Sequence, residues 1–456
     1  MAHRFQNIDR ATPMLLPPDL RDWVPEDDLV HFVIQAVERL PLSTFHVNHK
    51  GCGSAQYPPH LMLALLIYSY ANGLFSSRRI ERATYRDVAI RFLCANRHPD
   101  HDSICAFRRQ NLDAFATAFV EVLELARELK LLKLGCVSLD GTHLKASASK
   151  DKNVTYARAQ ELRAQLRTDV QQLLLQAEAA DQKEDDPQKL PQEIARREKL
   201  LAKMDAACAT LEARAQARAA EERAEHEKKL AARAERQGSA KGPPPQPPAD
   251  TPAPDEQINL TDDESNLMRK NKRESYTQSY NAQAVVDAEG SYLIVGQRVS
   301  NCAGDGGQLE KDLASIPEPL GTPTRVLADC GFADKEMFER LGCARPEWEL
   351  YVSVHREDAH AERRYDYRPL DKIKPPKKLV DPVLLAMAAK LQTPEGKAIY
   401  RQRASTVEPV FGIIKSALGF RQFLLRGLKK VSGEWTLVCL AWNLKRLHTL
   451  GAAAGR

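Results

Sequence analysis

The sequence predicts a mixed α/β sheet domain that follows an all-helical region and is interrupted by a long helical insertion. Short apolar runs with strand character recur at 136–139, 280–287, 291–299, 324–329 and 348–354. Apolar residues recur at helical spacing before residue 132, and residues 153–236 contain no glycine. The expected units are a helical domain (1–132), a sheet domain (133–152 and 257–450), an insertion (153–236) and a linker (237–256).

The composition and charge predict a large protein without a membrane span and with reduced cysteines. Its 456 residues include 66 basic and 61 acidic side chains, for a net charge of +5, so any polyanion-binding surface must come from how the charges are distributed. No segment approaches the roughly 18 uninterrupted apolar residues of a membrane span, and the first residues lack a signal-peptide pattern. Nine dispersed cysteines form no CxxC pair. We therefore expect a cytoplasmic protein without a membrane partner.

The first 132 residues are expected to fold into short helices that include a basic surface. The expected helices cover 29–40, 58–72, 76–84, 87–94, 102–111 and 113–132. A three-helix unit whose last helix is capped by Asp102 or Ser103, and shows Arg108 and Arg109, has the dimensions of a helix-turn-helix DNA reader. The alternative is that these arginines form only a solvated face.

Two of the expected strands end in an aspartate. Residues 136–139 run into Asp140 and Gly141, and residues 324–328 run into Asp329, which precedes a turn and a helix. Buried strands that deliver acids at their ends are typical of functional sites. The alternative for Asp140 is a simple turn-forming role before glycine. Between these two strands, 280–287 and 291–299 are expected to pair as a hairpin.

The insertion is expected to be an antiparallel helical hairpin that turns at 182–191. Its second half carries a heptad-like stripe of Ile194, Leu201, Met204, Cys208 and Leu211. This stripe either closes the hairpin on itself or offers a surface for a second subunit. The proline-rich linker 237–256 is expected to be extended and mobile.

Residues 400–430 place one acid, Glu408, among seven basic residues. We expect a helix capped by Thr406, with Pro409 in its first turn and with Glu408 and Lys415 on one face, about 10 Å apart along the axis. Such a segment attracts phosphate, and its cations include Arg403, Arg421 and Arg426. The alternative is an amphipathic helix with a solvated glutamate.

Asp140, Asp329 and Glu408 together form the candidate catalytic and metal-binding set. Three carboxylates without a His or Cys partner suit Mg²⁺ or Mn²⁺ better than zinc. A site of this kind can hold two ions about 3.5 to 4 Å apart, one to activate water or a 3′-hydroxyl and the other to stabilise the leaving oxygen.

These motifs resemble those of bacterial insertion-sequence transposases of the DDE type, whose catalytic domain is ribonuclease-H-like. The resemblance rests on DGTHLKASAS, SYNAQAVVD, VLADCGF, VEPVFGIIK with GFRQFLLRG, and LVCLAWNLKRLH, in this order. It implies a five-stranded mixed sheet, and places Asp140, Asp329 and Glu408 as ligands of two Mg²⁺ or Mn²⁺ ions. Tyr400, Arg403 and Lys415 match the tyrosine, arginine and lysine that flank the glutamate, although Arg403 lies five residues before Glu408 where many relatives show four.

The function implied by this resemblance is that of a DNA transposase. Such a protein binds the terminal inverted repeats of an insertion sequence and a target DNA, and cleaves and joins DNA strands in a metal-dependent reaction. It is expected to act at the nucleoid as a homodimer on paired ends, because transposition holds two ends together.

Several alternatives are open. The protein could be a catalytically silent DNA-binding derivative of a transposase, or a coiled-coil scaffold in which the insertion is the functional part. A zinc site is conceivable at Cys94, His98, His101 and Cys105, although the spacing matches no trusted finger pattern. His143 could approach a scissile strand or could be a structural residue near a turn. Cys330 adjoins Asp329 without a His partner, and burial is the expected role.

Overall fold

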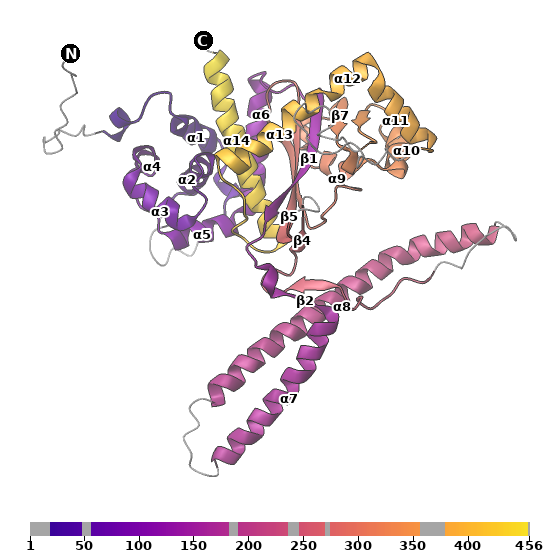
Figure 1. The fold of residues 1–456 in the computed structure, drawn as a ribbon. Helices are drawn as coiled ribbons and strands as arrows, with labels where there is room; N and C mark the ends of the chain where they lie inside the picture. Colours follow the sequence, from indigo (N-terminus) through magenta and orange to yellow (C-terminus); the bar gives the residue numbers. More distant parts are fainter. Residues whose placement is uncertain are drawn as a thin grey trace, which may run out of the picture.

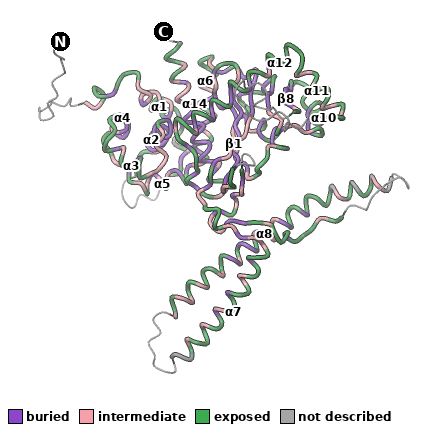
Figure 2. The backbone as a smooth tube through the Cα atoms, viewed as in Figure 1, coloured by how far each residue is buried: buried purple, intermediate pink, exposed green. Residues whose placement is uncertain are grey.

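The fold was obtained as a computed structural model, which describes residues 19–47, 56–181, 190–235, 246–269, 274–355 and 379–454. A body of helices packed on a sheet carries two helical arms that project from one side (Figure 1). Buried residues concentrate in the body, while most of the arms are exposed (Figure 2).

The sheet is mixed and has six strands in the described part of the chain. Its order is β4-β5-β1-β7-β8, and β6 also pairs with β5. β1 is antiparallel to β5 and parallel to β7, and β7 is parallel to β8. The strands are β1 (Cys136–Lys145), β4 (Asn266–Met268), β5 (Thr277–Asp287), β6 (Ile294–Ser300), β7 (Arg325–Ala328) and β8 (Glu349–Val352). The predicted mixed sheet with flanking helices and a helical N-terminal region is confirmed, and this order is compatible with a ribonuclease-H-like fold.

One strand differs from its predicted extent. β1 continues through Asp140 and Gly141 to Lys145, so no turn follows Asp140. The reason is pairing: β5 accompanies β1 from Val137 to Lys145, which compensates for the polar residues in its second half. The prediction that Asp140 ends a strand is therefore wrong. What ends near Asp140 is the parallel pairing with β7, whose last pair is Ser138 with Leu327.

The N-terminal region is helical, as predicted. Its helices are α1 (Leu29–Glu38), α2 (Pro59–Ala71), α3 (Ser77–Arg86), α4 (Val88–Leu93), α5 (His101–Gln110) and α6 (Leu112–Glu128). α5 is capped by Asp100, whose carboxylate accepts the Ser103 amide at 2.8 Å, and not by Asp102 or Ser103 as predicted.

The C-terminal helix α14 (Leu428–Ala454) joins the N-terminal helices to the sheet. It packs on α6, α2 and β6. Trp435, Cys439, Trp442 and Leu447 are among its buried residues. One continuous apolar core therefore runs from the N-terminal helices through α14 into the sheet.

The remaining helices of the body lie in the second half of the chain. They are α9 (Leu309–Leu313), α10 (Lys335–Ala344), α11 (Pro382–Gln392), α12 (Pro394–Tyr400) and α13 (Gln402–Gly412), followed by a π-helical turn over Ile413–Ala417.

The insertion consists of α7 (Tyr156–Asp181) and the much longer α8 (Leu190–Glu235). The first half of α8 packs antiparallel on α7, and its second half projects as a separate arm (Figure 1). The predicted turn at 182–191 lies mostly outside the described residues. Met204, Cys208 and Leu211 are buried against Leu166 and other residues of the insertion and its base, so most of the heptad-like stripe closes the hairpin on itself.

The described part of the linker lies along α8. Asp250 pairs with Arg223 at 2.5 Å and Glu256 with Arg218 at 2.6 Å. The carbonyls of Pro254 and Glu256 accept the first amides of α7. Residues 250–256 are thus fastened to the insertion, so the predicted mobile linker is wrong over this stretch, because ion pairs and helix-capping bonds hold it.

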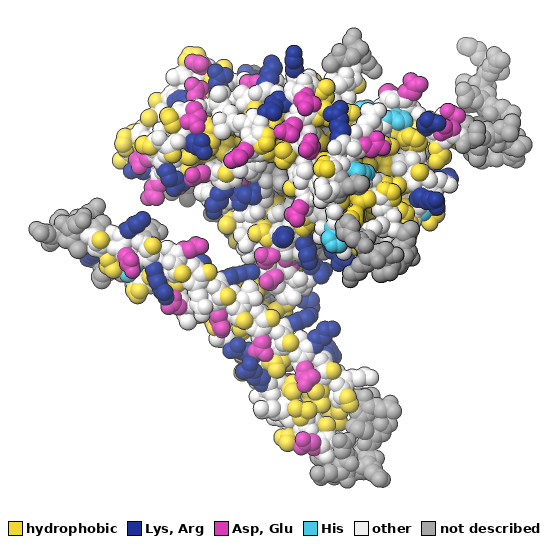
Figure 3. All heavy atoms as spheres, turned by 180° about the vertical axis from the view of Figure 1, so that it is seen from behind, with side chains coloured by type: hydrophobic (Ala, Val, Ile, Leu, Met, Phe, Trp, Pro, Cys, Tyr) yellow, Lys and Arg dark blue, Asp and Glu magenta, His cyan; other side chains and the backbone are white. Residues whose placement is uncertain are grey.

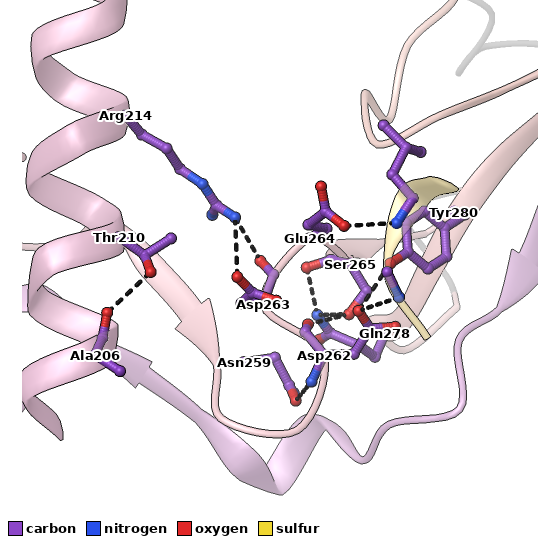
Figure 4. Close-up of polar contacts among 12 residues, drawn as sticks. Ala206, Thr210, Arg214, Asn259, Asp262, Asp263, Glu264, Ser265, Gln278 and Tyr280 are labelled. Atoms are coloured by element: carbon purple, nitrogen blue, oxygen red, sulfur yellow. Dashed lines mark hydrogen bonds and ion pairs between the residues drawn. The ribbon is translucent and has the colours of Figure 1, made fainter. Parts of the chain in front are cut away.

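A small two-stranded sheet and a polar cluster fasten the insertion to the body. β2 (Asn153–Thr155) pairs with β3 (Gln257–Asn259). Beyond β3, Asp262 accepts a hydrogen bond from the Tyr280 hydroxyl at 2.8 Å, and Gln278 donates to the Ser265 carbonyl at 2.7 Å (Figure 4). Arg214 of α8 reaches the Asp263 carbonyl at 2.9 Å. The base of the insertion is therefore anchored to β5.

Candidate active site

Asp140 lies on β1, and Asp329 directly follows the parallel strand β7. The pairing of β1 with β7 matches Cys136 with Arg325 and Ser138 with Leu327. The same register continued by two residues places Asp329 beside Asp140. Adjacent strands lie about 4.8 Å apart, so the two carboxylates stand at one edge of the pairing.

Asp140 lies in a low-polarity setting beside other acids. The pKa of Asp140 is raised to about 7, mainly by burial and in addition by the charges of Asp329 and Asp305. A hydrogen bond from the Gly141 amide and the nearby Arg403 guanidinium act in the opposite direction. A bound cation would stabilise the charged form of this carboxyl.

Asp329 begins the 3₁₀ turn Cys330–Phe332 and accepts a hydrogen bond from the Gly331 amide. The turn therefore orients one carboxylate oxygen of Asp329, which directly follows the last residue of β7. Cys330 is half-buried in the same turn.

Glu408 lies in the middle of α13, which packs against β1. The predicted start of this helix at Thr406 is wrong: α13 begins at Gln402, and the Thr406 hydroxyl donates to the Gln402 carbonyl at 2.6 Å. Pro409 lies inside the helix and removes one backbone hydrogen bond. Burial of Val407, Val410 and Phe411 in the core compensates for that loss.

Arg403 links two of the candidate ligands. Its Nη1 lies 4.0 Å from Asp140 Oδ2, and its Nη2 lies 3.4 Å from Glu408 Oε1. The guanidinium itself is buried, with a side chain that is 7% exposed. A single cation thus spans the gap between Asp140 and Glu408, even though Arg403 lies five residues before Glu408 in the sequence.

Lys415 lies on the π-helical turn that follows α13. Its Nζ donates to the Thr142 hydroxyl and to the His143 carbonyl, the latter at 2.9 Å. The extra residue of a π turn shifts side chains around the helix axis, and such turns recur at functional sites. Lys415 is therefore held against β1, two to three residues beyond Asp140.

The other predicted DNA contacts lie around the same edge. Tyr400 ends α12, with the Arg403 guanidinium 5.8 Å from its ring centre. Arg421 and Arg426 are exposed, and each donates through Nε to a carbonyl, at 2.9 Å to Lys415 and 2.8 Å to Ser147. The loop that carries them lies along the end of β1, where the Phe423 amide donates to the Lys145 carbonyl.

The sequence prediction missed a fourth carboxylate, Asp305, in the loop after β6. The side-chain amides of Asn281 and Gln283 both donate to Asp305 Oδ1, at 2.9 and 2.7 Å. A Cβ at Gly141 would lie only 2.5 Å from the same oxygen. The available signal was an acid flanked by glycines shortly after a strand, together with two amides at alternate positions of β5.

The donor set fits a hard divalent cation better than zinc. In the ranges that the structure describes, no three His, Cys, Asp or Glu side chains already stand close enough to hold a metal ion. At the edge of β1, however, Asp305 and Asp329 lie near Asp140, whose negative charge burial opposes and Arg403 partly balances. Carboxylate oxygens are the ligands that Mg²⁺ and Mn²⁺ prefer.

The predicted zinc alternative does not assemble. His98 stacks on Tyr85, with ring centres 3.8 Å apart, and His101 pairs with Glu81 at 2.8 Å. Cys94 is buried in the apolar core. His143 has a structural contact, since its Nε2 donates to the Ala303 carbonyl at 3.0 Å.

Arg108 does not face a DNA groove in this structure. It is 3% exposed and donates to the Tyr70 hydroxyl at 2.9 Å and the Phe75 carbonyl at 3.0 Å, with Glu434 of α14 at 4.0 Å. The prediction for this side chain is therefore corrected: α5 turns it into the core, where Glu434 balances its charge. Arg109, one residue later, is exposed.

The comparisons with known protein families agree with the geometry. Residues 376–448 match the family described as transposase DDE domain, and residues 18–110 match the transposase domain DUF772. The first match contains Glu408, Arg403 and Lys415, and the second spans α1 to α5. The two matches support a DDE-type insertion-sequence transposase. No curated protein and no solved structure matches the chain.

The matched families imply a DNA substrate, and DDE transposases typically use divalent metal ions. The two aspartates lie outside both matched ranges. The register of β1 with β7 relates them to each other, and Arg403 relates Asp140 to Glu408. Within the described ranges, none of the helices of the transposase combines the length and the apolar character that crossing a membrane requires.

Proposed function

We propose that this transposase binds the ends of an insertion sequence and cleaves and transfers DNA strands with divalent ions held by Asp140, Asp329 and Glu408. The observation that supports the proposal is that Asp140 lies near Asp329 and shares the Arg403 guanidinium with Glu408. Register places Asp329 beside Asp140, and the Arg403 guanidinium spans Asp140 and Glu408. The presence of all three acids favours an active enzyme over a catalytically silent DNA-binding protein.

The chain's own groups have distinct roles in this proposal. Asp140, Asp329 and Glu408 supply oxygen donors for Mg²⁺ or Mn²⁺, from two strands and one helix. Bound divalent ions supply Lewis-acid stabilisation of the reacting phosphate. Arg403 orients Asp140 and Glu408, and Lys415, fixed to β1, places a positive charge next to the site for a neighbouring phosphate.

The test is cleavage of a DNA duplex that carries one end of the element, with Mg²⁺, with Mn²⁺ and with a chelator. Asp140→Asn, Asp329→Asn and Glu408→Gln should each lower cleavage by at least about 1,000-fold, the order expected when an electrostatic catalytic group is removed. DNA binding in a gel-shift assay should stay within about twofold. Glu318→Gln, an exposed acid in the turn before β7, is the matched control. Cleavage that survives in any of the three variants contradicts the assignment.

The DNA-binding surface is better placed on α3 than on α5. Arg78, Arg82 and Arg86 recur every four residues on α3 and are exposed, as is Arg79. Tyr85 of the same helix is 57% exposed. We therefore propose that α3, with Arg109, contacts phosphates of the element ends, while Arg421 and Arg426 contact DNA near the active site.

The salt dependence of DNA binding tests whether α3 contacts the phosphates. Replacement of Arg78, Arg82 and Arg86 by alanine should weaken binding of end DNA and reduce the slope of log K against log salt by about 2.7, since each phosphate that a cation neutralises contributes roughly 0.9. Arg39→Ala with Lys133→Ala, two exposed cations outside α3, is the control and should leave the slope unchanged. An unchanged slope in the α3 variant excludes α3 from the interface.

A further inference from the structure

The loop between β6 and α9 brings one more acid to the edge of β1. Asp305 is half-buried, and the loop that carries it is held from two sides. His143 of β1 donates to the Ala303 carbonyl, and the Gln308 amide donates to the Asp305 carbonyl at 3.1 Å. The position of this carboxylate is therefore fixed by β1 and by its own turn.

The side chain of Asp305 is oriented by buried amides of β5. Asn281 and Gln283, each 1% exposed, lie two residues apart on one face of the strand and donate to Asp305 Oδ1. Both bonds use Oδ1, so among the described contacts Oδ2 is the oxygen turned toward Gly331. A Cβ at Gly331 would lie 3.3 Å from Asp305 Oδ2 and 3.3 Å from Asp329 Oδ1.

Gly141 is what admits this acid to the site. Adjacent residues of a strand project to opposite faces, so Asp140 and Gly141 face opposite sides of β1. Gln283 is the partner of Gly141 in the register. A Cβ at Gly141 would lie 2.5 Å from Asp305 Oδ1, 2.5 Å from Gln283 Nε2 and 2.8 Å from Asn281 Oδ1. The absent side chain leaves room for a carboxylate to reach the strand from the face opposite Asp140.

A second observation indicates a polar ligand here. The carbonyl oxygens of the Asn281 and Gln283 side chains are buried and accept no hydrogen bond from the described residues. Buried acceptors without a partner cost free energy, and Asn281 Oδ1 is aimed at the same point above Gly141 as Asp305 Oδ1. Unsatisfied oxygens beside a fixed carboxylate are donors for a hydrated cation.

We propose that Asp305 is a fourth carboxylate of the active site, which approaches through the gap at Gly141 and shares a divalent ion with Asp329. This inference rests on the proposed function. Asn281 and Gln283 are positioning residues in it, because they act through Asp305. Asp305 and Asp329 would each supply an oxygen ligand to this ion near Gly331, which both carboxylates approach.

The test measures Mn²⁺ binding to the full chain by calorimetry and by the loss of free Mn²⁺ signal in electron paramagnetic resonance. Asp305→Asn keeps an acceptor for the two amides but removes the charge, and should weaken Mn²⁺ binding at least about tenfold or remove one bound ion, with an unchanged melting temperature without metal. Glu310→Gln, which only removes an exposed pairing with Arg340, is the control and should bind Mn²⁺ as the native protein does. Native Mn²⁺ affinity and stoichiometry in Asp305→Asn overturn the proposal.

Asp140→Asn separates this inference from the proposed function. If Asp140→Asn weakens Mn²⁺ binding and Asp305→Asn does not, only the role of Asp305 fails; if neither does, the metal site itself is wrong.

A second measurement needs no variant. Fe²⁺ with ascorbate and peroxide generates hydroxyl radicals at a bound ion, and should cut the native chain near residues 140–142, 329–331 and 305–307. Cuts near the first two segments without a cut near 305–307 contradict the proposal.

Discussion

Asp140 is half-buried among other acids, so its protonation state is tied to folding. Because burial raises the pKa of Asp140 to about 7, above the ordinary value of 3.8, the native state binds this proton more tightly than the unfolded chain does. The resulting stability is fully present below about pH 4 and is lost as the pH rises through about 7. At 1.36 kcal/mol per pKa unit, the loss amounts to at most about 4 kcal/mol.

Asp140→Asn should therefore stabilise the metal-free protein at neutral pH. We expect its free energy of unfolding to match that of the native protein near pH 4 and to exceed it increasingly up to pH 7 and above. Denaturant unfolding with a chelator at several pH values measures the difference, with Glu318→Gln as the control. If the difference in free energy of unfolding between the two proteins does not change with pH across this range, Asp140 has an ordinary pKa. Added Mn²⁺ should narrow the difference, because only the native carboxylate gains a cation.

At the scale of the elements, α5 and α14 are joined by a buried charge pair. Arg108 lies 4.0 Å from Glu434, which is completely buried and accepts the amides of Leu424 and Leu425, both at 2.9 Å. Glu434 thereby fixes the start of the loop that carries Arg426. The pair connects an N-terminal helix to the loop beside the active site.

Arg108→Met should destabilise the protein by about 3 to 5 kcal/mol, because it leaves Glu434 buried without a balancing charge. The double variant with Glu434→Gln should recover part of that loss. Arg109→Ala is the matched neighbour: it should change the free energy of unfolding by less than about 0.5 kcal/mol. Denaturant unfolding of the four proteins measures these values. Equal stability of Arg108→Met and Arg109→Ala would show that the buried pair does not hold the two helices.

The boundaries of these elements show how far sequence patterns reach. Apolar periodicity predicts the helices and the sheet strands well, because it reports the faces that the core buries, as in α6. It misses the length of β1, since the polar residues after Asp140 are held by pairing with β5, which lies far away in sequence. It misplaces the start of α13 because Pro409 signals a helix start, whereas burial on both sides of Pro409 keeps the helix continuous.

In the candidate site too, the sequence predicts individual residues but not how the fold brings them together. Asp140, Asp329 and Glu408 could be found because each follows or lies on a patterned element, but their mutual register could not. Asp305 follows β6 in an irregular loop, and only the fold places it above Gly141. Arg108 and Arg109 look equivalent in the sequence, and only the packing of α5 turns one inward and the other outward.

At the scale of the whole molecule, the insertion is a separate attachment to a continuous body. Its small core, formed by Leu166, Met204, Cys208, Leu211 and neighbours, is distinct from the large core. Lys and Arg side chains are spread over both arms and gather where the arms meet the body (Figure 3). Over their whole length, α7 and α8 carry 13 basic and 13 acidic residues, so the arms present a mixed charged surface with no net charge.

The base of the insertion offers a clean place to remove it. Thr155 of β2 is paired directly with Gln257 of β3, so the two cut ends already lie side by side. Deletion of residues 156–256 with a short Gly-Ser turn should leave β1, β5 and the anchoring cluster around Asp262 intact. We expect the shortened transposase to fold and to nick a single element end in a metal-dependent reaction.

Joining of two ends is the step that the deletion should impair. We propose that the transposase acts as a dimer on paired ends, with the arms reaching the second subunit or its DNA. Because most of the heptad-like stripe closes the hairpin on itself, the contact would use the outer faces of the arms, where Leu174, Leu175 and Leu200 are exposed. Replacement of these three leucines by glutamine in the full chain tests the same contact with a smaller change than the deletion of residues 156–256. Native mass spectrometry with DNA and a two-end strand-transfer assay measure both variants. Loss of paired-end joining with native single-end nicking supports the role; full joining and an unchanged assembly in both variants would show that the arms are dispensable.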